Sequence, residues 1–276
     1  DGVQYTRPEG SVHRHPTWNP VLFQYPGGGP LMLFYKCGPT PDSWWGMVMS
    51  STDGGTTWTT PVRLPEQIDG PVRNKPILLN DGTLLCGSST EFDGWRLHFE
   101  FTKDQGATWQ RVPAIHDGKT FGAIQPSLMR HADGHIQALC RNQNSEGQVL
   151  TTSTADGGKT WSTLKETNLP NPNSGIDGVV LKDGRSMLIY NHTKRSTKPA
   201  GREMLNIGIS EDKISWQAAG VLENTPKSEF SYPAIIQSAD GMVHVTYTWK
   251  RKLIRYVKID PAKLQLKPFN GSNWPF

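Results

Sequence analysis

Short apolar runs separated by glycine-containing turns recur along the whole chain. Residues 76–82 (PILLNDG) and 178–184 (GVVLKDG) each end in Asp-Gly, and each is followed by a second apolar run. Such turns between apolar runs are a strong signal for β-hairpins. No apolar pattern with a period of 3.6 residues is sustained, and 28 glycines and 21 prolines disfavour long helices. The chain is therefore predicted to be all-β.

The hairpins are grouped into repeated units. Each unit opens with an apolar strand and a turn, continues with a second apolar strand, and usually reaches a third. Five openings are visible, at residues 20–29, 76–82, 126–134, 178–184 and 233–241. About four short strands in every ~50 residues is typical of a β-propeller blade. Because blades in one ring share their cores, residues 1–276 are predicted to form a single domain.

An eight-residue motif marks the end of three of these units. The pattern [ST]-x-D-x-G-x-T-W occurs at residues 51–58, 102–109 and 154–161, and a shortened copy follows at 210–216. The aspartate can accept backbone hydrogen bonds within a turn, glycine adopts positive φ at little cost, and tryptophan supplies an apolar anchor. We therefore expect these motifs to be structural turns and not catalytic residues.

The three cysteines are predicted to be buried free thiols. Cys37, Cys86 and Cys140 occupy equivalent second strands of successive units, which lie too far apart for a disulfide. No spacing typical of a metal site is present, so neither a metal nor another cofactor is expected.

Composition narrows the classes of partner. The net charge of +4 is not gathered into a basic run, so a nucleic-acid partner is not expected. No run approaches the ~20 apolar residues of a membrane span. The chain opens at Asp1 without a leader, which suggests upstream processing, and sequons at Asn191 and Asn270 are compatible with a secreted, extracellular glycoprotein.

The repeated motif resembles the Asp boxes, or BNR repeats, of the sialidase (neuraminidase) superfamily. The sequence segments at residues 70–79, 124–128, 169–177, 222–224 and 231–251 resemble segments of its exo-α-sialidase branch. The resemblance implies a six-bladed β-propeller. Five units are visible, which leaves three possibilities. A sixth blade is built from both termini, or the ring closes with five blades. In the third, an N-terminal blade is partly or wholly missing, and a companion N-terminal fragment or an oligomer supplies it.

The resemblance also implies a catalytic set. Sialidases hold the substrate carboxylate with three arginines, whose planar guanidinium groups match it with paired hydrogen bonds. A tyrosine acts as nucleophile beside a carboxylate base, and an aspartate is the acid/base catalyst. The tyrosine corresponds to Tyr232, and the carboxylate to Asp177 or Glu229. The candidate arginines are Arg73, Arg141, Arg202 and Arg251.

Further polar residues are expected where blade-entry loops open on the propeller axis. Asn19, Asn74 and Asn173 could equally cap turns, and His13 and His15 could lie in an exposed loop. Lys75 follows Arg73 directly, and two adjacent cations ahead of a buried strand are costly unless they are paired. The candidate substrate-binding residues besides the arginines are Lys75, Asn74, Gln125, Asn173 and Glu91.

Three functions remain open at this stage. The first is a glycoside hydrolase that acts on an acidic, carboxylate-bearing sugar of a glycan. The second is a uronate polysaccharide lyase that keeps the arginines and uses a Tyr or His base. The third is a carbohydrate-binding propeller, a lectin, which has lost catalysis but keeps the arginine-lined funnel.

Overall fold

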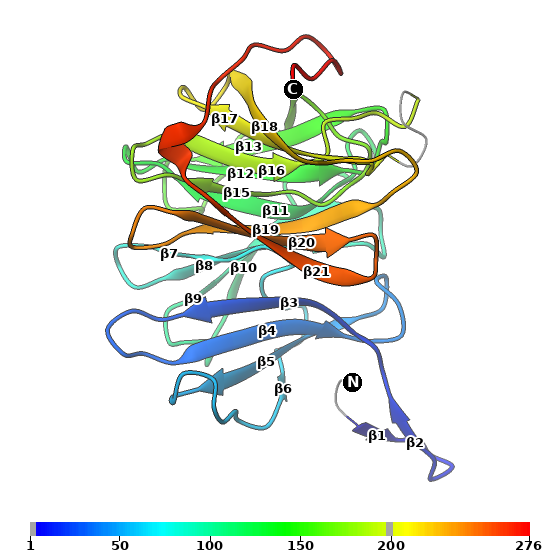
Figure 1. The fold of residues 1–276 in the computed structure, drawn as a ribbon. Coiled ribbons are helices and arrows are strands. Elements are labelled where there is room, and N and C mark those ends of the chain that lie inside the picture. The colour runs from blue at the N-terminus through cyan, green and yellow to red at the C-terminus, as the bar shows by residue number, and fades with distance from the viewer. Residues whose placement is uncertain (1–3, 197–200) are drawn as a thin grey trace.

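The structure, a computed structural model, describes residues 4–196 and 201–276 and is built almost entirely of β-strands (Figure 1). A two-stranded hairpin, β1 (Gln4–Thr6) and β2 (Val12–Arg14), precedes five antiparallel sheets. The one helix in the described ranges is a short 3-10 turn, η1 (Pro261–Lys263). The prediction of an all-β fold is confirmed.

Each sheet is one blade, and four of the five blades contain four strands. The strands of these blades run in chain order. Blade 1 has β3 (Thr17–Gln24), β4 (Leu31–Cys37), β5 (Trp45–Ser51) and β6 (Val62–Arg63), and blade 2 has β7 (Ile77–Leu78), β8 (Leu84–Thr90), β9 (Arg96–Thr102) and β10 (Gln110–Val112). Blade 3 has β11 (Ala123–Arg130), β12 (Ile136–Asn142), β13 (Gln148–Thr154) and β14 (Lys165–Pro170), and blade 4 has β15 (Asp177–Val180), β16 (Ser186–Tyr190), β17 (Met204–Ser210) and β18 (Trp216–Asn224). Blade 5 has three strands, β19 (Phe230–Gln237), β20 (Val243–Trp249) and β21 (Leu253–Ile259).

The expectation of six blades is wrong for this chain, because the two termini do not build a sixth sheet together. Strands β1 and β2 pair with one another, and the C-terminal segment turns back onto blade 4, where Lys267 bridges Ala218 (Figure 1). Within the described ranges, no backbone hydrogen bond joins blade 1 to blade 5. Ile236 of blade 5 is 54% exposed and Leu22 of blade 1 is 58% exposed.

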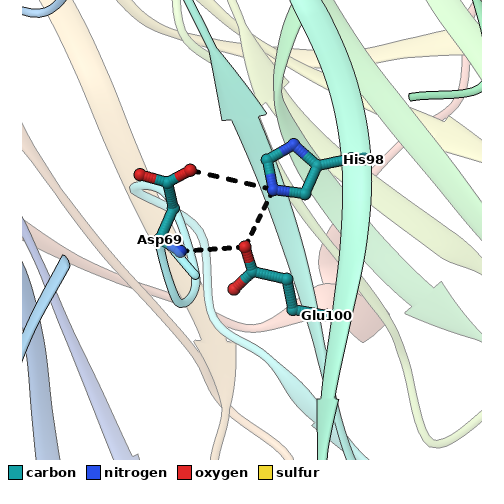
Figure 2. Close-up of side chains that lie close together, drawn as sticks. All are labelled: Asp69, His98 and Glu100. Carbon is teal, nitrogen blue, oxygen red and sulfur yellow. Dashed lines mark hydrogen bonds and ion pairs between the residues drawn. The ribbon is translucent and has the colours of Figure 1, made fainter. Parts of the chain in front are cut away.

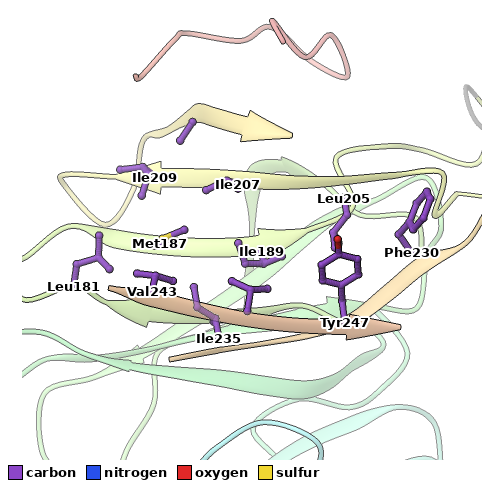
Figure 3. Packing of buried hydrophobic residues seen from close by; sticks show 12 residues of the cluster. Leu181, Met187, Ile189, Leu205, Ile207, Ile209, Phe230, Ile235, Val243 and Tyr247 are labelled. Carbon is purple, nitrogen blue, oxygen red and sulfur yellow. The ribbon is translucent and has the colours of Figure 1, made fainter. Parts of the chain in front are cut away.

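Apolar side chains from neighbouring blades form the cores. Between blades 4 and 5, Met187, Ile189 and Leu205 pack against Ile235 and Val245 (Figure 3). Successive side chains of a strand point to opposite faces of the sheet, so a blade with apolar residues on both faces can pack against a neighbouring blade on either side. Cys37, Cys86 and Cys140 are buried and unpaired in these cores, as predicted.

The Asp boxes are structural turns, as predicted. In the third box, Asp156 accepts hydrogen bonds from the backbone nitrogen of Thr160 at 3.0 Å and from its hydroxyl at 2.6 Å. The indole of Trp161 donates to the carbonyl of Gly158 and stacks on Phe99 of the preceding blade, with 3.6 Å between ring centroids. The other two boxes repeat the same bonds, so each motif closes a turn. In the second box, Trp109 also meets Phe34 of the preceding blade edge to face, with 6.1 Å between ring centroids.

The sequon at Asn191 is not an acceptor in the folded protein, which corrects the prediction for this position. The Asn191 side chain is fully buried, and its amide nitrogen donates to the carbonyls of Met204 at 2.7 Å and Phe230 at 2.9 Å. A glycan on that nitrogen would break both bonds and would have no space. Asn270 lies exposed near the C-terminus, so its glycosylation stays a prediction.

The C-terminal segment is fastened by a buried histidine. His192 lies between the hydroxyl of Tyr190 and the carbonyl of Gly271, which its Nε2 meets at 2.9 Å, and its ring packs on Trp274. Burial lowers the pKa of His192 from 6.5 to about 4, so the folded protein holds this ring neutral.

This histidine predicts a loss of stability in acid. Between pH ~6.5 and ~4 the unfolded chain binds a proton at His192 that the folded chain does not, so the free energy of unfolding falls by up to about 3 kcal/mol as the pH drops. Urea denaturation across this range, compared between the wild type and His192→Phe, isolates the contribution of this side chain. Identical pH profiles for the two proteins would contradict the prediction.

Candidate functional site

A residue with positive φ stands at or just before the first strand of every blade. These residues are Asn19 (φ 48°), Arg73 (69°), Gln125 (56°), Asn173 (60°) and Tyr232 (53°). Positive φ is rare for a bulky residue such as tyrosine, and it costs on the order of 1 to 3 kcal/mol unless the surroundings impose it. Such strain is concentrated at functional sites, which makes this ring of residues the first place to look for one.

Bulges followed by proline produce this geometry in three blades. The pairing of the first two strands shifts register at Asn19-Pro20, at Gln125-Pro126 and at Tyr232-Pro233. A bulge locally re-aims side chains, and proline is tolerated where ladder hydrogen bonds are interrupted. The X-Pro pairs that open these three units are a signal of the site that the sequence offers directly.

Tyr232 is the centre of a cluster of arginines. The guanidinium carbons of Arg202 and Arg73 lie 5.2 and 5.5 Å from the centroid of its ring. Burial alone would raise the pKa of Tyr232, but the charges of Arg202, Arg141 and Arg73 and a hydrogen bond from Arg202 outweigh it and lower the pKa. The side chain is 38% exposed, so solvent and a ligand can reach it. The phenol is therefore more acidic than an ordinary tyrosine.

Glu229 joins two of the arginines on one side of this cluster. One of its carboxylate oxygens accepts from Arg202 at 3.0 Å and the other accepts from Arg251 at 2.6 Å. Burial opposes ionisation, but the hydrogen bonds from Arg251, Ser231 and Arg202 prevail and lower the pKa of Glu229. Glu229 is thus a carboxylate at neutral pH, three residues from Tyr232.

Arg73 is in the cluster but its guanidinium is already occupied. It donates to the carbonyls of Ile176 at 2.6 Å and Pro233 at 2.7 Å, and to Asn74. Burial lowers the pKa of Arg73 to about 10, which leaves it charged at neutral pH. Arg73 therefore ties blade 2 to blades 4 and 5 beneath the ring of Tyr232.

Lys75 and Asp177 form an ion pair between blades. The Lys75 ammonium lies 3.0 Å from both carboxylate oxygens of Asp177, which also accept from the hydroxyl of Ser127 at 2.7 Å and the backbone nitrogen of Ile235 at 3.0 Å. The side chain of Asp177 is 4% exposed, and its hydrogen bonds in the described part of the chain do not include Tyr232. The pair links blades 2 to 5 at their first strands, so its geometry is that of a structural fastening.

The remaining candidates surround Arg141. Its Nε donates to Asn173 at 2.7 Å, and its guanidinium lies over the ring of Trp95 at 5.0 Å. Gln125 accepts a longer bond from Arg141 at 3.4 Å. Half-buried Glu91 interacts electrostatically with Arg141, and burial raises the pKa of Glu91. Trp95, which the sequence analysis did not single out, thus completes the support of this arginine.

Some expected residues lie elsewhere or have other partners. His13 and His15 pack against each other on the β1–β2 hairpin, and His15 meets Trp45 edge to face, so they form a separate cluster. Asn74 is buried and donates to the backbone of Gln125.

A cavity of about 600 Å³ lies between blades 2 and 3, away from Tyr232. Its lining includes the Asp-box residues Thr108 and Asp156, whose polar groups bond within their own turns. Hydrogen bonds lower the pKa of Asp81 and of Asp156 on this lining, so both carboxylates are already held, by Lys103 and Thr83 and by Thr160.

A second buried cluster of charges lies between blades 1 and 2, and sequence reasoning missed it. Glu100 accepts from the backbone nitrogens of Asp69 at 2.9 Å and Gly70 at 2.6 Å, and from Nε2 of His98 at 2.8 Å (Figure 2). The fully buried Lys36 ammonium lies 3.9 Å from Asp69. Asp69, His98 and Glu100 lie close enough to hold a metal ion, but Lys36 already supplies a cation and Glu100 already accepts three hydrogen bonds. The cluster therefore fits an ion network that fixes the segment leading to Arg73.

The fold and the site define a class: a β-propeller with Asp boxes and an arginine-ringed tyrosine. The family model for the BNR repeat-like domain matches residues 4–245. The chain therefore belongs to the BNR-repeat family of the sialidase superfamily.

Individual relatives agree with this assignment. A sialidase from Bacteroides fragilis (strain YCH46) is 27% identical over 189 residues, which are 62% of this chain and 33% of that protein. The Hadza microbial sialidase Hz136 superposes with a TM-score of 0.72 at 18% identity, over 91% of this chain and 54% of that one. A Penicillium chrysogenum alpha-L-arabinanase superposes at 0.67 and 17% identity, over 90% and 78%. The chain spans about a third of the curated sialidase, and these structures share its fold.

Proposed function

We propose that this chain is a sialidase-like glycoside hydrolase that acts on an acidic, carboxylate-bearing sugar. Tyr232 carries the proposal, since it is a partly exposed phenol in the arginine cluster and its pKa is lowered against the effect of its own burial. A more acidic phenol is a better nucleophile at neutral pH. A tyrosine nucleophile is a known exception to the two-carboxylate scheme of glycosidases.

The arginines of the site support an anionic substrate. Four of them gather near Tyr232, and the carboxylates beside them are Glu229 and Glu91, so positive charge is in excess. Arg141, Arg202 and the exposed Arg251 are the arginines we assign to a sugar carboxylate, which would replace Glu229 as a partner of Arg202 and Arg251. Arg73 is committed to backbone carbonyls. Glu229, rather than Asp177, is the carboxylate we assign to Tyr232, because Asp177 is held by Lys75, Ser127 and Ile235.

A lectin is the second candidate, and one observation favours it. Both oxygens of Glu229 are already engaged by arginines, so a free base beside Tyr232 requires one of these bonds to open when substrate binds. If they stay closed, the site binds an acidic sugar without cleaving it. Secretion, which would bring the chain to extracellular glycans, is part of either proposal.

The test is a set of assays on the purified chain. Methylumbelliferyl glycosides of N-acetylneuraminic acid and of glucuronic acid are compared with the neutral galactoside, and release of the fluorophore from an acidic glycoside alone supports the hydrolase. Ultraviolet absorbance of an unsaturated product from a uronate polysaccharide would identify a lyase instead. Saturable binding on a glycan array without either product would identify a lectin.

A further inference from the structure

Strand β21 leaves one edge of blade 5 open. Blades 1 to 4 each end in a fourth strand, whereas blade 5 ends at β21, which pairs with β20 alone in the described part of the chain. The open edge is seven residues long, Leu253–Ile259, and lies on the outside of the propeller (Figure 1). An unpaired edge of this length presents a row of backbone donors and acceptors that another strand can bind.

Two of the usual protections of an edge strand are missing from β21, and the third is weakened. Natural edges are blunted by proline, by bulges or by charged side chains. Residues 253–259 contain neither proline nor glycine, and their register with β20 runs without a shift over seven pairs. The two cations of the strand are neutralised within the same molecule, Arg255 by Glu223 at 2.7 Å and Lys258 by Asp240 at 3.3 Å.

The side chains of β21 are also more apolar than a solvated edge requires. Leu253, Ile254 and Tyr256 are 51%, 70% and 56% exposed. Ile254 and Tyr256 lie on one face of the strand and Leu253 lies on the other, since successive side chains of a strand alternate between its faces. The strand thus combines unused hydrogen-bonding capacity with uncovered apolar surface.

We propose that β21 pairs with β21 of a second copy of this chain in an antiparallel, two-fold symmetric dimer. The register that pairs all seven residues is centred on Tyr256. It places Arg255 opposite Val257 and Lys258 opposite Ile254, so no cation faces a cation, and it places Leu253 opposite Ile259. A surface that is complementary to itself in this way is what a two-fold interface requires.

The paired strands join two three-stranded sheets into one continuous sheet of six. Directly opposed side chains in an antiparallel pair lie within contact distance, so apolar pairs and aromatic pairs add to the new ladder of hydrogen bonds. The two Tyr256 rings meet at the symmetry axis. β21 is the outer strand of blade 5, whereas Tyr232 stands on the inner strand, β19.

The oligomeric state tests the proposal. Light scattering after gel filtration, across roughly 1 to 100 µM protein, is expected to show a mass twice the 30.7 kDa of one chain at the upper concentrations. Tyr256→Lys places two cations face to face on the axis and is expected to give a monomer. Ile214→Lys, which changes an exposed apolar residue away from β21, is the matched control and should leave the dimer intact.

A charge exchange separates loss of pairing from loss of folding. Tyr256→Asp alone should also be monomeric, but an equimolar mixture of Tyr256→Lys and Tyr256→Asp should recover the dimer mass, since the axis then joins opposite charges. A wild-type chain that stays monomeric at every concentration overturns the proposal, and so does a dimer that survives Tyr256→Lys.

Discussion

Replacing Tyr232 by phenylalanine is expected to abolish turnover of the acidic glycoside while leaving its binding nearly unchanged. Removing a nucleophile lowers turnover on the order of 10³-fold or more, because no other group forms the covalent intermediate. Binding should persist because phenylalanine keeps the ring that lies against Arg73 and Arg202, and those arginines and Arg141 keep their own partners. The measurements are kcat on the sialoside and a dissociation constant for the free acidic sugar.

Two results would count against this assignment. Turnover of Tyr232→Phe within a few-fold of the wild type would remove Tyr232 as the nucleophile. Loss of turnover together with loss of sugar binding would show that the hydroxyl holds the ligand instead of attacking it. Tyr256→Phe, at an exposed tyrosine on β21 that is not among the groups acting on Tyr232, is the control and should behave as the wild type.

Much of the fold could be predicted from local sequence. The Asp-Gly turns and Asp boxes are short-range signals, since Asp156 bonds to Thr160 four residues away, and they locate the repeated units correctly. Counting these units gives five, which is the number of blades in the structure, whereas the expectation of six came from the family resemblance. Local signals could not show whether the ring of blades closes. Ring closure depends on where the two ends of the chain pack. The bridge between Lys267 and Ala218 joins residues far apart in the sequence, so no local motif predicts it.

The sequence predicted which residues form the candidate site, but not which groups they are hydrogen-bonded to. Tyr232, Arg73, Arg141 and Arg202 do come together. They stand at different places in their blades: Arg73 ahead of β7, Arg141 on β12, Arg202 ahead of β17 and Tyr232 on β19. The sequence could not show that Arg73 is occupied by the carbonyls of Ile176 and Pro233, since those contacts cross between blades. Burial of Asn191 was hidden for the same reason.

The buried charges around Glu100 lead to the largest expected effect on stability. Glu100→Ala removes the acceptor of two backbone N–H groups, at Asp69 and Gly70, and leaves Lys36 and His98 facing Asp69 alone. Removing one partner from a buried ion network costs about 3 to 5 kcal/mol, because the charges and donors that remain lose their compensation. Urea denaturation of the wild type and the variant measures the difference.

Two comparisons determine whether the ion network is the cause. Glu100→Gln keeps one carbonyl acceptor, so its loss should be smaller than that of Glu100→Ala. Lys36→Met alone should also destabilise the fold, but combined with Glu100→Gln it should cost less than the two separate losses added together, since the paired charges are then removed as a unit. If a chelator lowers the melting temperature of the wild type, a bound metal and not Lys36 compensates Asp69 and Glu100, and the assignment of this cluster as an ion network fails. If melting is unchanged by the chelator, the network itself fixes residues 69–75, and Arg73 reaches the ring of Tyr232 because Glu100 holds the segment that carries it.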